Sequence, residues 1–415
     1  MSVMPAGCSL SLAMLALAIV ALCSGPAFAG RPTWMPAAPP LKAQGRAVEV
    51  STVAALQDAI ATARDGDTIA IADGVYQLDR FLELTGRTNV TIRGASGDAA
   101  KVELRGIGWD DTDRDDILRI QGCTNVTVAY ITFAECHAYG IKLEQVPYQG
   151  RQLVNIDIYA CNFRNVGTRA IKGTGGGGGH VDGGSIRYCN FENTKIPPRT
   201  WQFDGDYITA IDLMRLKDWV IADNYFHNMR GANGGGRGAI FVWVESRNVI
   251  SERNVFVNCD RSIAYGNPSG STEVPSDPHN VGGVIRNNFI VAGADAGIEI
   301  SWARGVKVYH NTVLTPGENG TAIHYHWNEI SGIDIASNLV RGRIYGEEGG
   351  VTKRGNASPA RDSWFRAIAE GDLHLTPDGA AAAPREARVA DCLEDFDRKP
   401  RPEQTDVGGD EHAAK

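Results

Sequence analysis

The chain has 415 residues, of which 43% are hydrophobic and 22% are charged, a composition that excludes a disordered or collagen-like protein. Its 41 Lys and Arg residues stand against 49 Asp and Glu residues, and the net charge of −8 argues against a general affinity for nucleic acid. Glycine is abundant, with 48 residues, which favours tight turns between short strands over a helical protein.

The first 29 residues have the pattern of a targeting segment. They carry no Lys, Arg, Asp or Glu, and an apolar run from Leu10 to Cys23 is followed by Ala27-Phe28-Ala29. This pattern predicts a secretory signal peptide that is cleaved before Gly30. No later stretch approaches the roughly 20 apolar residues of a membrane helix. We therefore expect a secreted or periplasmic monomer with no membrane partner.

A Pro-rich lead-in, residues 30–47, precedes the first predicted helix. Residues 52–64 place Val53, Leu56, Ile60 and Ala63 on one face, with Gly66 beyond the end. This amphipathic pattern predicts a helix that covers the open end of the following structure. The strand 68–71 and the turn Asp73-Gly74 come next.

One sequence motif then recurs along most of the chain. An Ile that starts an alternating run is followed 13 to 15 positions later by an Asn, and a large apolar residue comes two positions after that Asn, as in Ile211, Asn224 and Phe226. The number of residues between successive Asn residues varies, whereas the alternation within each strand stays the same. This combination indicates a solenoid of short strands with insertions in its turns. The Asn residues expected to stack in one turn are 162, 190, 224, 254, 288, 311 and 338.

These observations predict an all-β, single-stranded right-handed parallel β-helix of about nine coils, with three short parallel sheets and an N-terminal capping helix. The helix region is expected at 48–345, and residues 346–415 form a C-terminal closing segment and tail. The capping helix, Gly66-Asp67-Thr68-Ile69, Asp73-Gly74-Val75-Tyr76 and the stacked Asn residues resemble the secreted right-handed parallel β-helix proteins of the pectin-lyase-like superfamily. This resemblance implies the fold and a polysaccharide partner, but it does not select one reaction.

Six cysteines remain after the predicted signal peptide, and none forms a CxxC pair. Cys161 and Cys189 occupy equivalent places in successive repeats. Their side chains would point the same way in a parallel stack, so we favour buried free thiols over a disulfide.

In the resembling enzymes, polysaccharide lies along one of the parallel sheets, so the outward residues of the Ile-initiated strand form the candidate site. Aligning the coils gives a first outward column of Glu83, Arg119, Lys142, Lys172, Asp212, Phe241, Ala264, Glu299 and His324. A second column, two residues on, consists of Thr85, Gln121, Glu144, Thr174, Met214, Trp243, Gly266, Ser301 and His326. Vertical neighbours in such a column lie roughly 4.8 Å apart.

The first column contains a basic run that suits β-elimination of a uronate polymer. This reaction needs a cation for the C6 carboxylate, a base for the C5 proton and an acid at the departing oxygen. We assign Arg119 and Lys142 to carboxylate binding and Lys172 to the base. His180 and Tyr207, both in the loops around the glycine run 175–179, are the candidate acids. The alternative is that the basic side chains are merely solvated.

Four further residues complete the predicted site. Asp212 follows Lys172 in the column and is included among the catalytic candidates. Phe241 and Trp243 form an expected aromatic platform for a sugar ring. Glu144 is placed with the substrate-binding residues, and calcium is the candidate ion that would join a substrate carboxylate to Asp212 or Glu144. No cofactor is otherwise assigned.

Three alternative functions stay open, namely a glycoside hydrolase, a C5-epimerase and a non-catalytic glycan-binding protein. Asp204, Asp206 and Asp212 could act as paired carboxylates in hydrolysis, although the Asn-Thr-Asp, Asp-Asp, Gly-His-Gly and Arg-Ile-Lys set of the polygalacturonase relatives is missing from the sequence. Residues 277–280 match three letters of the Asp-Pro-His-Asp signature of mannuronan epimerases. A non-catalytic glycan-binding β-helix is the third alternative.

Histidine and glutamate residues near the end of the solenoid suggest a metal only weakly. His324 and His326 alternate on one strand, with Glu299 one coil below, and His310 lies nearby in sequence. Because surface histidines are common without a metal, we assign no residue to a metal site.

Overall fold

The computed structural model describes residues 30–412 except for residues 43, 113–115, 175–178, 268–277, 327–329 and 348. The predicted signal peptide, residues 1–29, lies outside the described residues. In the described part of the chain, every helix is too short or too polar to span a membrane.

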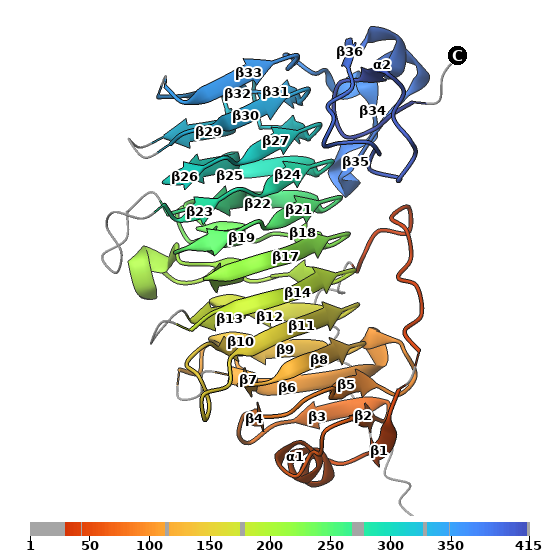
Figure 1. The fold of residues 1–415 in the computed structure, drawn as a ribbon, viewed down its shortest axis with the longest axis vertical. Helices are drawn as coiled ribbons and strands as arrows, with labels where there is room; N and C mark the ends of the chain where they lie inside the picture. Colours follow the sequence, from red (N-terminus) through yellow and green to blue (C-terminus); the bar gives the residue numbers. More distant parts are fainter. Residues whose placement is uncertain are drawn as a thin grey trace, which may run out of the picture.

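The described strands stack in parallel, coil upon coil, into an elongated right-handed β-helix (Figure 1). Strand alternation accounts for this arrangement, because inward Ile, Val, Leu and Phe side chains form one continuous buried core along the stack. The predicted fold class is confirmed.

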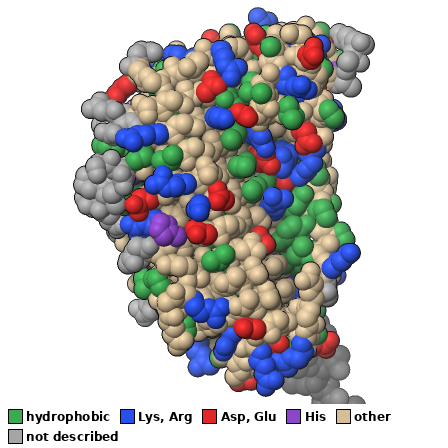
Figure 2. Space-filling view, in the orientation of Figure 1, with side chains coloured by type: hydrophobic (Ala, Val, Ile, Leu, Met, Phe, Trp, Pro, Cys, Tyr) green, Lys and Arg blue, Asp and Glu red, His purple; other side chains and the backbone are tan. Residues whose placement is uncertain are grey.

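One face of the solenoid is sheet A, which contains 15 strands of the described residues. Its main path is β1 (Arg46–Val50), β2 (Asp67–Ile71), β5 (Thr91–Gly94), β8 (Thr124–Ala129), β11 (Leu153–Tyr159), β14 (Val181–Arg187), β17 (Leu216–Ala222), β21 (Ile250–Glu252), β24 (Val284–Arg286), β27 (Lys307–Tyr309), β30 (Ile333–Ala336) and β33 (Val351–Arg354). Three short strands pair beside this path, namely β20 (Ser246–Arg247), β23 (Asn280–Val281) and β26 (Ala303–Arg304). Figure 2 shows positive and negative side chains interspersed over the side of the molecule in view.

The other two faces belong to sheet B. The face that carries the candidate site consists of β4 (Leu82–Thr85), β7 (Asp116–Gln121), β10 (Tyr139–Glu144), β13 (Arg169–Thr174), β16 (Thr209–Met214), β19 (Gly238–Trp243), β22 (Val255–Tyr265), β25 (Phe289–Ser301), β29 (Thr321–His326) and β32 (Arg343–Gly346). The second face consists of β3 (Gly74–Gln77), β6 (Val102–Gly108), β9 (Thr132–Cys136), β12 (Asn162–Val166), β15 (Asn190–Glu192), β18 (Tyr225–His227), β28 (Thr312–Leu314) and β31 (Leu339–Arg341), together with the first halves of β22 and β25. The three predicted sheets are thus two hydrogen-bonded sheets, because β22 and β25 continue round the corner between these faces.

A ladder of buried asparagines runs along one turn of the solenoid. From Asn254 onward, each Asn side chain accepts hydrogen bonds from the backbone and side chain of the Asn one coil below, as Asn254 Oδ1 does from Asn224 N at 3.1 Å and from Asn224 Nδ2 at 3.0 Å. The ladder consists of Asn224, Asn254, Asn288, Asn311, Asn338 and Asn356.

The predicted ladder is wrong by one residue in the first coils. Asn162 pairs with Asn190 and Asn190 with Tyr225, so Cys161 and Cys189 hold the places that correspond to Asn224. The Cys189 backbone N–H donates to Asn224 Oδ1 at 2.9 Å and ends the ladder. All six described cysteines are free and buried, as predicted for Cys161 and Cys189.

We expect Asn254→Ala to lower the free energy of unfolding by about 2–4 kcal/mol, because it leaves buried donors and acceptors on two neighbouring coils without partners. Asn319→Ala, at an exposed turn, is the matched control and should change the stability by less than about 0.5 kcal/mol. Chemical denaturation of both variants checks this. Equal effects of the two substitutions would show that the ladder contributes nothing beyond the general fold.

The predicted capping helix is α1 (Val53–Ala61). Thr52 is its N-cap and accepts a hydrogen bond from the Ala55 backbone N–H, and Leu56 and Ile60 are buried against the first coil. The helix ends three residues before the predicted end at Arg64, because the backbone N–H of Arg64 donates to Asp67 instead of continuing the helix.

The C-terminal closing segment packs against the side of the later coils and contains small elements of its own (Figure 1). It contains the antiparallel pairs β34 (Phe365–Ala367) with β35 (Asp372–Leu375) and β36 (Arg385–Ala387) with β37 (Gln404–Asp406), and the helix α2 (Pro377–Ala382). It also contains single turns of 3₁₀-helix at η4 (Asp362–Trp364) and η5 (Ile368–Glu370). Earlier in the chain lie η1 (Ala99–Lys101) and η3 (Gln202–Gly205), of which η3 is irregular because Phe203 and Asp204 have left-handed backbone angles. The lead-in runs along the side of the coils towards the closing segment (Figure 1), where Trp34 and Met35 join its apolar core.

His374 in β35 gives the closing segment a pH-dependent stability. Burial alone would lower its pKa, but hydrogen bonds to Asp372 and Asp397 outweigh burial and raise the pKa to about 9. Because the folded pKa is raised, this stabilisation is complete below the unfolded pKa near 6.5 and is lost as the pH rises through 9. The stability difference between the protein and His374→Gln should shrink by roughly 3 kcal/mol from about pH 6 to about pH 10. Denaturation at several pH values measures it, and a constant difference would contradict it.

Candidate active site

The outward column on sheet B has the predicted vertical order. Lys142 pairs with Arg119 on one side and with Lys172 on the other, Lys172 pairs with Asp212, and Asp212 pairs with Phe241. The column is ordered because each of these coils places a buried Ile or Leu directly before the outward residue, which fixes the register.

Asp212 is the centre of a buried charge cluster. Its carboxylate lies 2.9 Å from Lys172 Nζ and 3.4 Å from Arg169 Nε, and it accepts a hydrogen bond of 3.0 Å from Trp243 Nε1. Asp212 has no exposed surface, and only 6% of Lys172 is exposed. This carboxylate therefore holds two cations together on the outward face of β13 and β16.

The cluster shifts the pKa values of both groups. Burial would raise the pKa of Asp212, but Lys172 and Arg169 outweigh burial and hold it below its usual value. Burial lowers the pKa of Lys172, and the charges of Arg169 and Lys142 lower it further against the opposing effect of Asp212. Lys172 thus gives up its proton more readily than an exposed lysine.

Arg169 is a site residue that our sequence analysis missed. Its guanidinium lies 3.8 Å from the centre of the Tyr207 ring and 5.9 Å from that of Tyr139. It starts β13, three residues before Lys172, and so lies outside the two outward columns that were aligned. A signal was available, because Tyr139, Arg169 and Thr209 occupy one register row of polar and aromatic residues beside the column.

The two candidate acids lie in different surroundings. Tyr207 is half-buried against Arg169, and burial together with the Asp212 carboxylate raises the pKa of its hydroxyl, which keeps it protonated. His180 is exposed, and its backbone N–H donates to the side chain of Gln152 at 3.2 Å. The glycines 175–178 before it lie outside the described residues. The contacts favour Tyr207.

The predicted basic run is largely neutralised by acidic partners, which the column alone did not reveal. Arg119 lies 2.6 Å from Asp116 on its own strand, and Lys142 lies 3.4 Å from Glu144. Glu144 also accepts a hydrogen bond of 3.1 Å from the Thr174 hydroxyl. The site is therefore a set of ion pairs and not a patch of unpaired positive charge.

The expected aromatic platform is reduced to one ring. Phe241 has no exposed surface, because the ring of Trp243 stacks on it with 5.1 Å between centroids. Trp243 is partly exposed. The prediction that Phe241 contacts a sugar is wrong for this arrangement, since Phe241 supports Trp243 from below.

The candidate calcium ligands do not fit a calcium ion. The Asp212 carboxylate is enclosed by two cations and an indole N–H. Glu144 is held by Lys142 and Thr174. A divalent cation would be repelled by Lys172 and Arg169 at the first position and would have to displace an ammonium group at the second.

The residues considered for hydrolysis and for epimerisation make contacts outside the Asp212 cluster. Asp206 accepts hydrogen bonds from the backbone and side chain of Asn233, while Asp204 is exposed, so neither is paired with Asp212 in the described contacts. In the epimerase-like segment, Asp277 lies outside the described residues. His279 is buried, accepts the Asn267 backbone N–H at 2.8 Å, and has a pKa lowered by burial to about 4.

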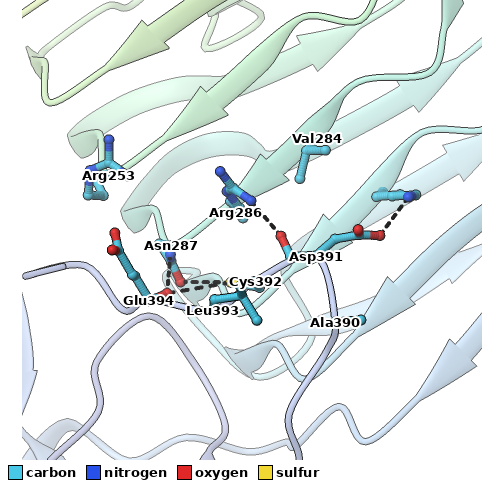
Figure 3. Close-up of a pocket in the computed structure, with 10 residues that line it drawn as sticks. Arg253, Val284, Arg286, Asn287, Ala390, Asp391, Cys392, Leu393 and Glu394 are labelled. Atoms are coloured by element: carbon cyan, nitrogen blue, oxygen red, sulfur yellow. Dashed lines mark hydrogen bonds and ion pairs between the residues drawn. The ribbon is translucent and has the colours of Figure 1, made fainter. Parts of the chain in front are cut away.

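A separate cavity of about 470 Å³ lies between sheet A and the closing segment (Figure 3). Lys307 Nζ lies 2.6 Å from Asp391 Oδ2, and Asn287 Nδ2 donates to the backbone carbonyl of Glu394 at 2.8 Å. Because these contacts join the coils to the closing segment, we interpret the cavity as part of the packing interface between them and not as a binding site.

Comparison with known proteins agrees with this architecture. A family model described as a right handed beta helix region matches residues 148–340. No match was found among curated proteins. The chain is a right-handed parallel β-helix protein with a buried Lys-Arg-Asp cluster on its outward face.

Three solved structures are among those to which this chain is similar. An alginate lyase from Paenibacillus sp. str. FPU-7 is 16% identical, with a TM-score of 0.46 over 74% of this chain and 99% of that chain. Endopolygalacturonase I from Stereum purpureum is 13% identical, with a TM-score of 0.47 over 74% of this chain and 99% of that chain. The A-module of a mannuronan C-5 epimerase from Azotobacter vinelandii is 13% identical, with a TM-score of 0.42 over 74% of this chain and 95% of that chain.

Proposed function

We propose that the protein cleaves an acidic, uronate-containing polysaccharide by β-elimination. The observation that carries this proposal is Lys172, a buried lysine with a lowered pKa between Lys142 and Asp212 on the outward face of the solenoid. A lysine in this setting is a candidate general base.

Lys172 is the proposed base. In its neutral form, the Nζ atom takes the C5 proton of a bound uronate. The Asp212 carboxylate, 2.9 Å away, orients the amine before the reaction and stabilises the ammonium group after it.

Lys142 and Arg169 are the proposed partners of the C6 carboxylate. Lys142 is the register neighbour of Lys172, and Arg169 lies on the same strand as Lys172 and contacts the same aspartate. A cation at this carboxylate makes the C5 proton more acidic by stabilising the charge that develops when the proton leaves. Arg119, one coil beyond Lys142, suits the carboxylate of a neighbouring sugar.

Tyr207 is the proposed acid. The electron pair of the broken C5–H bond forms the C4–C5 double bond, and the C4–O bond breaks with its electrons on the departing oxygen. The Tyr207 hydroxyl, held protonated by its raised pKa, gives that oxygen a proton. The next cycle begins after the proton on Lys172 passes through solvent back to the tyrosinate.

Incubation of the purified protein with pectate, alginate, hyaluronan, chondroitin and heparan tests the proposal. The expected result is a rise in ultraviolet absorbance from the 4,5-unsaturated uronate on one of these polymers, and Lys172→Ala should abolish the rise. New reducing ends without absorbance would indicate hydrolysis, and inverted uronates without cleavage would indicate epimerisation. Binding without any chemical change would indicate a glycan-binding β-helix.

A further inference from the structure

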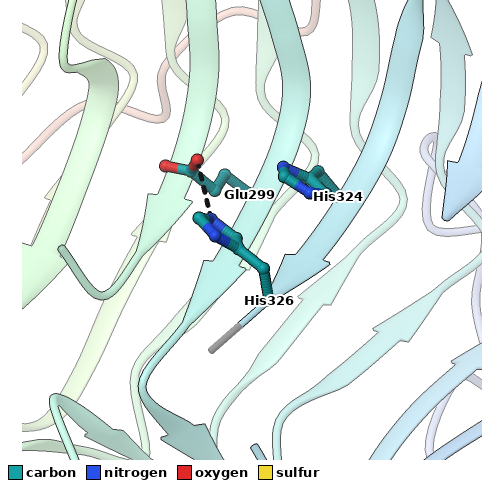
Figure 4. Close-up of side chains that lie close together, drawn as sticks. All are labelled: Glu299, His324 and His326. Atoms are coloured by element: carbon teal, nitrogen blue, oxygen red, sulfur yellow. Dashed lines mark hydrogen bonds and ion pairs between the residues drawn. The ribbon is translucent and has the colours of Figure 1, made fainter. Parts of the chain in front are cut away.

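Two histidines and a glutamate meet on the outward face of sheet B, towards the C-terminal end of the solenoid. Glu299 in β25 pairs in register with His324 in β29, and His326 follows two residues later on the same strand. One ligand atom from each of the three side chains lies within 4.8 Å of the other two. Figure 4 shows the Glu299 carboxylate and the His326 ring facing each other across the two strands.

The spacing of these atoms suits a small divalent ion. His326 Nε2 lies 3.1 Å from Glu299 Oε1. Two ligand atoms, each about 2.0–2.1 Å from a tetrahedral zinc ion, lie roughly 3.4 Å apart. An ion can therefore replace this hydrogen bond with a shift of a few tenths of an ångström. The His324 ligand atom lies within 4.8 Å of the other two, so it needs an adjustment of at most about 1.4 Å to complete a three-ligand site.

The charges around the cluster also favour a cation. Arg261 Nη1 lies 2.8 Å from Glu299 Oε2, and the guanidinium of Arg261 is in turn paired with Asp295. One arginine and two carboxylates leave a net charge of −1 beside the two imidazole rings, which favours the binding of a cation.

Neighbouring rings hold the two imidazoles in place. The rings of His324 and His326 are nearly parallel, with 4.2 Å between centroids, and Tyr345, the register partner of His324, stacks on His324 at 4.7 Å. The Arg343 guanidinium covers the Tyr345 ring at 4.5 Å. Such support restricts the ligands before binding and lowers the entropic cost of capturing an ion.

We propose that Glu299, His324 and His326 bind a divalent transition-metal ion of the zinc class. Imidazole nitrogen with one carboxylate oxygen is a donor set for zinc, cobalt or nickel and not for calcium. This revises the sequence-based view that assigned no metal ligand. The site lies three strands along the column from Asp212, through Phe241 and Ala264, and does not depend on β-elimination at Lys172.

Calorimetric titration of the full-length protein with zinc, and titration with cobalt followed by visible absorbance, test the site. The protein should bind one more equivalent of zinc than the double variant His324→Ala/His326→Ala. Glu299→Gln, which keeps the shape of the side chain, should raise the dissociation constant at least tenfold. The comparison between variants also removes any binding at the separate cluster of His374, Asp397 and Asp410.

His227→Ala is the matched control. His227 Nδ1 lies 3.0 Å from Glu192 Oε1, but this pair is in neither of the three-ligand clusters found in the described residues. The control should bind zinc as the unmodified protein does. Circular dichroism without metal shows whether each variant is folded. Equal stoichiometry and affinity in the unmodified protein, the double variant and Glu299→Gln would overturn the proposal, as would zinc binding lost equally in His227→Ala.

Discussion

Replacing Lys172 by methionine is expected to lower the kcat of uronate elimination by about 10²–10⁴-fold, because the substitution removes the proposed base. Methionine keeps an unbranched apolar stem in the buried position, so packing is largely retained. The unmodified enzyme should gain activity as the pH rises towards the pKa of Lys172, which burial places below that of an ordinary lysine. Initial rates from product absorbance across a pH series measure both effects.

Lys101→Met is the control for Lys172→Met, because Lys101 is exposed and its partner Asp98 is 3.8 Å away at the surface. It should retain full activity. Thermal unfolding of both variants separates loss of the base from loss of the fold. A folded Lys172→Met protein with unchanged kcat and an unchanged pH profile would assign the base to another residue.

Asp212→Asn is expected to lower the free energy of unfolding by about 3–5 kcal/mol, because it leaves Lys172 and Arg169 buried beside a neutral amide. Asp218→Asn is the matched control, since Asp218 is exposed and its contact is an amide hydrogen bond from Asn248. It should change the stability by less than about 0.5 kcal/mol.

Chemical denaturation at neutral pH compares these two aspartate variants. The loss in Asp212→Asn should diminish at high pH, where Lys172 is neutral in both proteins and only Arg169 stays charged. A stability equal to that of Asp218→Asn would show that the buried ion pairs do not hold this part of the sheet together.

The outward column could be predicted from the sequence because strand alternation has a period of two and buried Ile residues mark each coil. Lys142, Lys172 and Asp212 therefore appeared in the correct vertical order. The same pattern could not place Arg169, which lies at the entrance of its strand, where the chain leaves a turn and alternation does not yet apply.

Other features could not be predicted because they depend on side chains and strand pairings outside the aligned columns. Phe241 is outward in phase, yet its exposure is removed by Trp243 on the same strand. The ladder positions of Cys161 and Cys189 were misassigned to the Asn residues that follow them. Each of those Asn residues directly precedes a Phe, whereas Asn224 precedes Phe226 by two positions, so the two motifs differ by one residue. Residue spacing in the sequence does not reveal the burial of Phe241 or the ladder positions of the two cysteines, whereas the contacts and strand register of the structure do.

The mass of the released oligosaccharides tests the central claim most directly. β-Elimination breaks the glycosidic bond without adding water, so products formed in ¹⁸O-labelled water should contain no label from the cleavage step and should carry one unsaturated uronate at the new non-reducing end. Products that are heavier by one water molecule and incorporate the label would contradict elimination at Lys172 and assign the cleavage to hydrolysis.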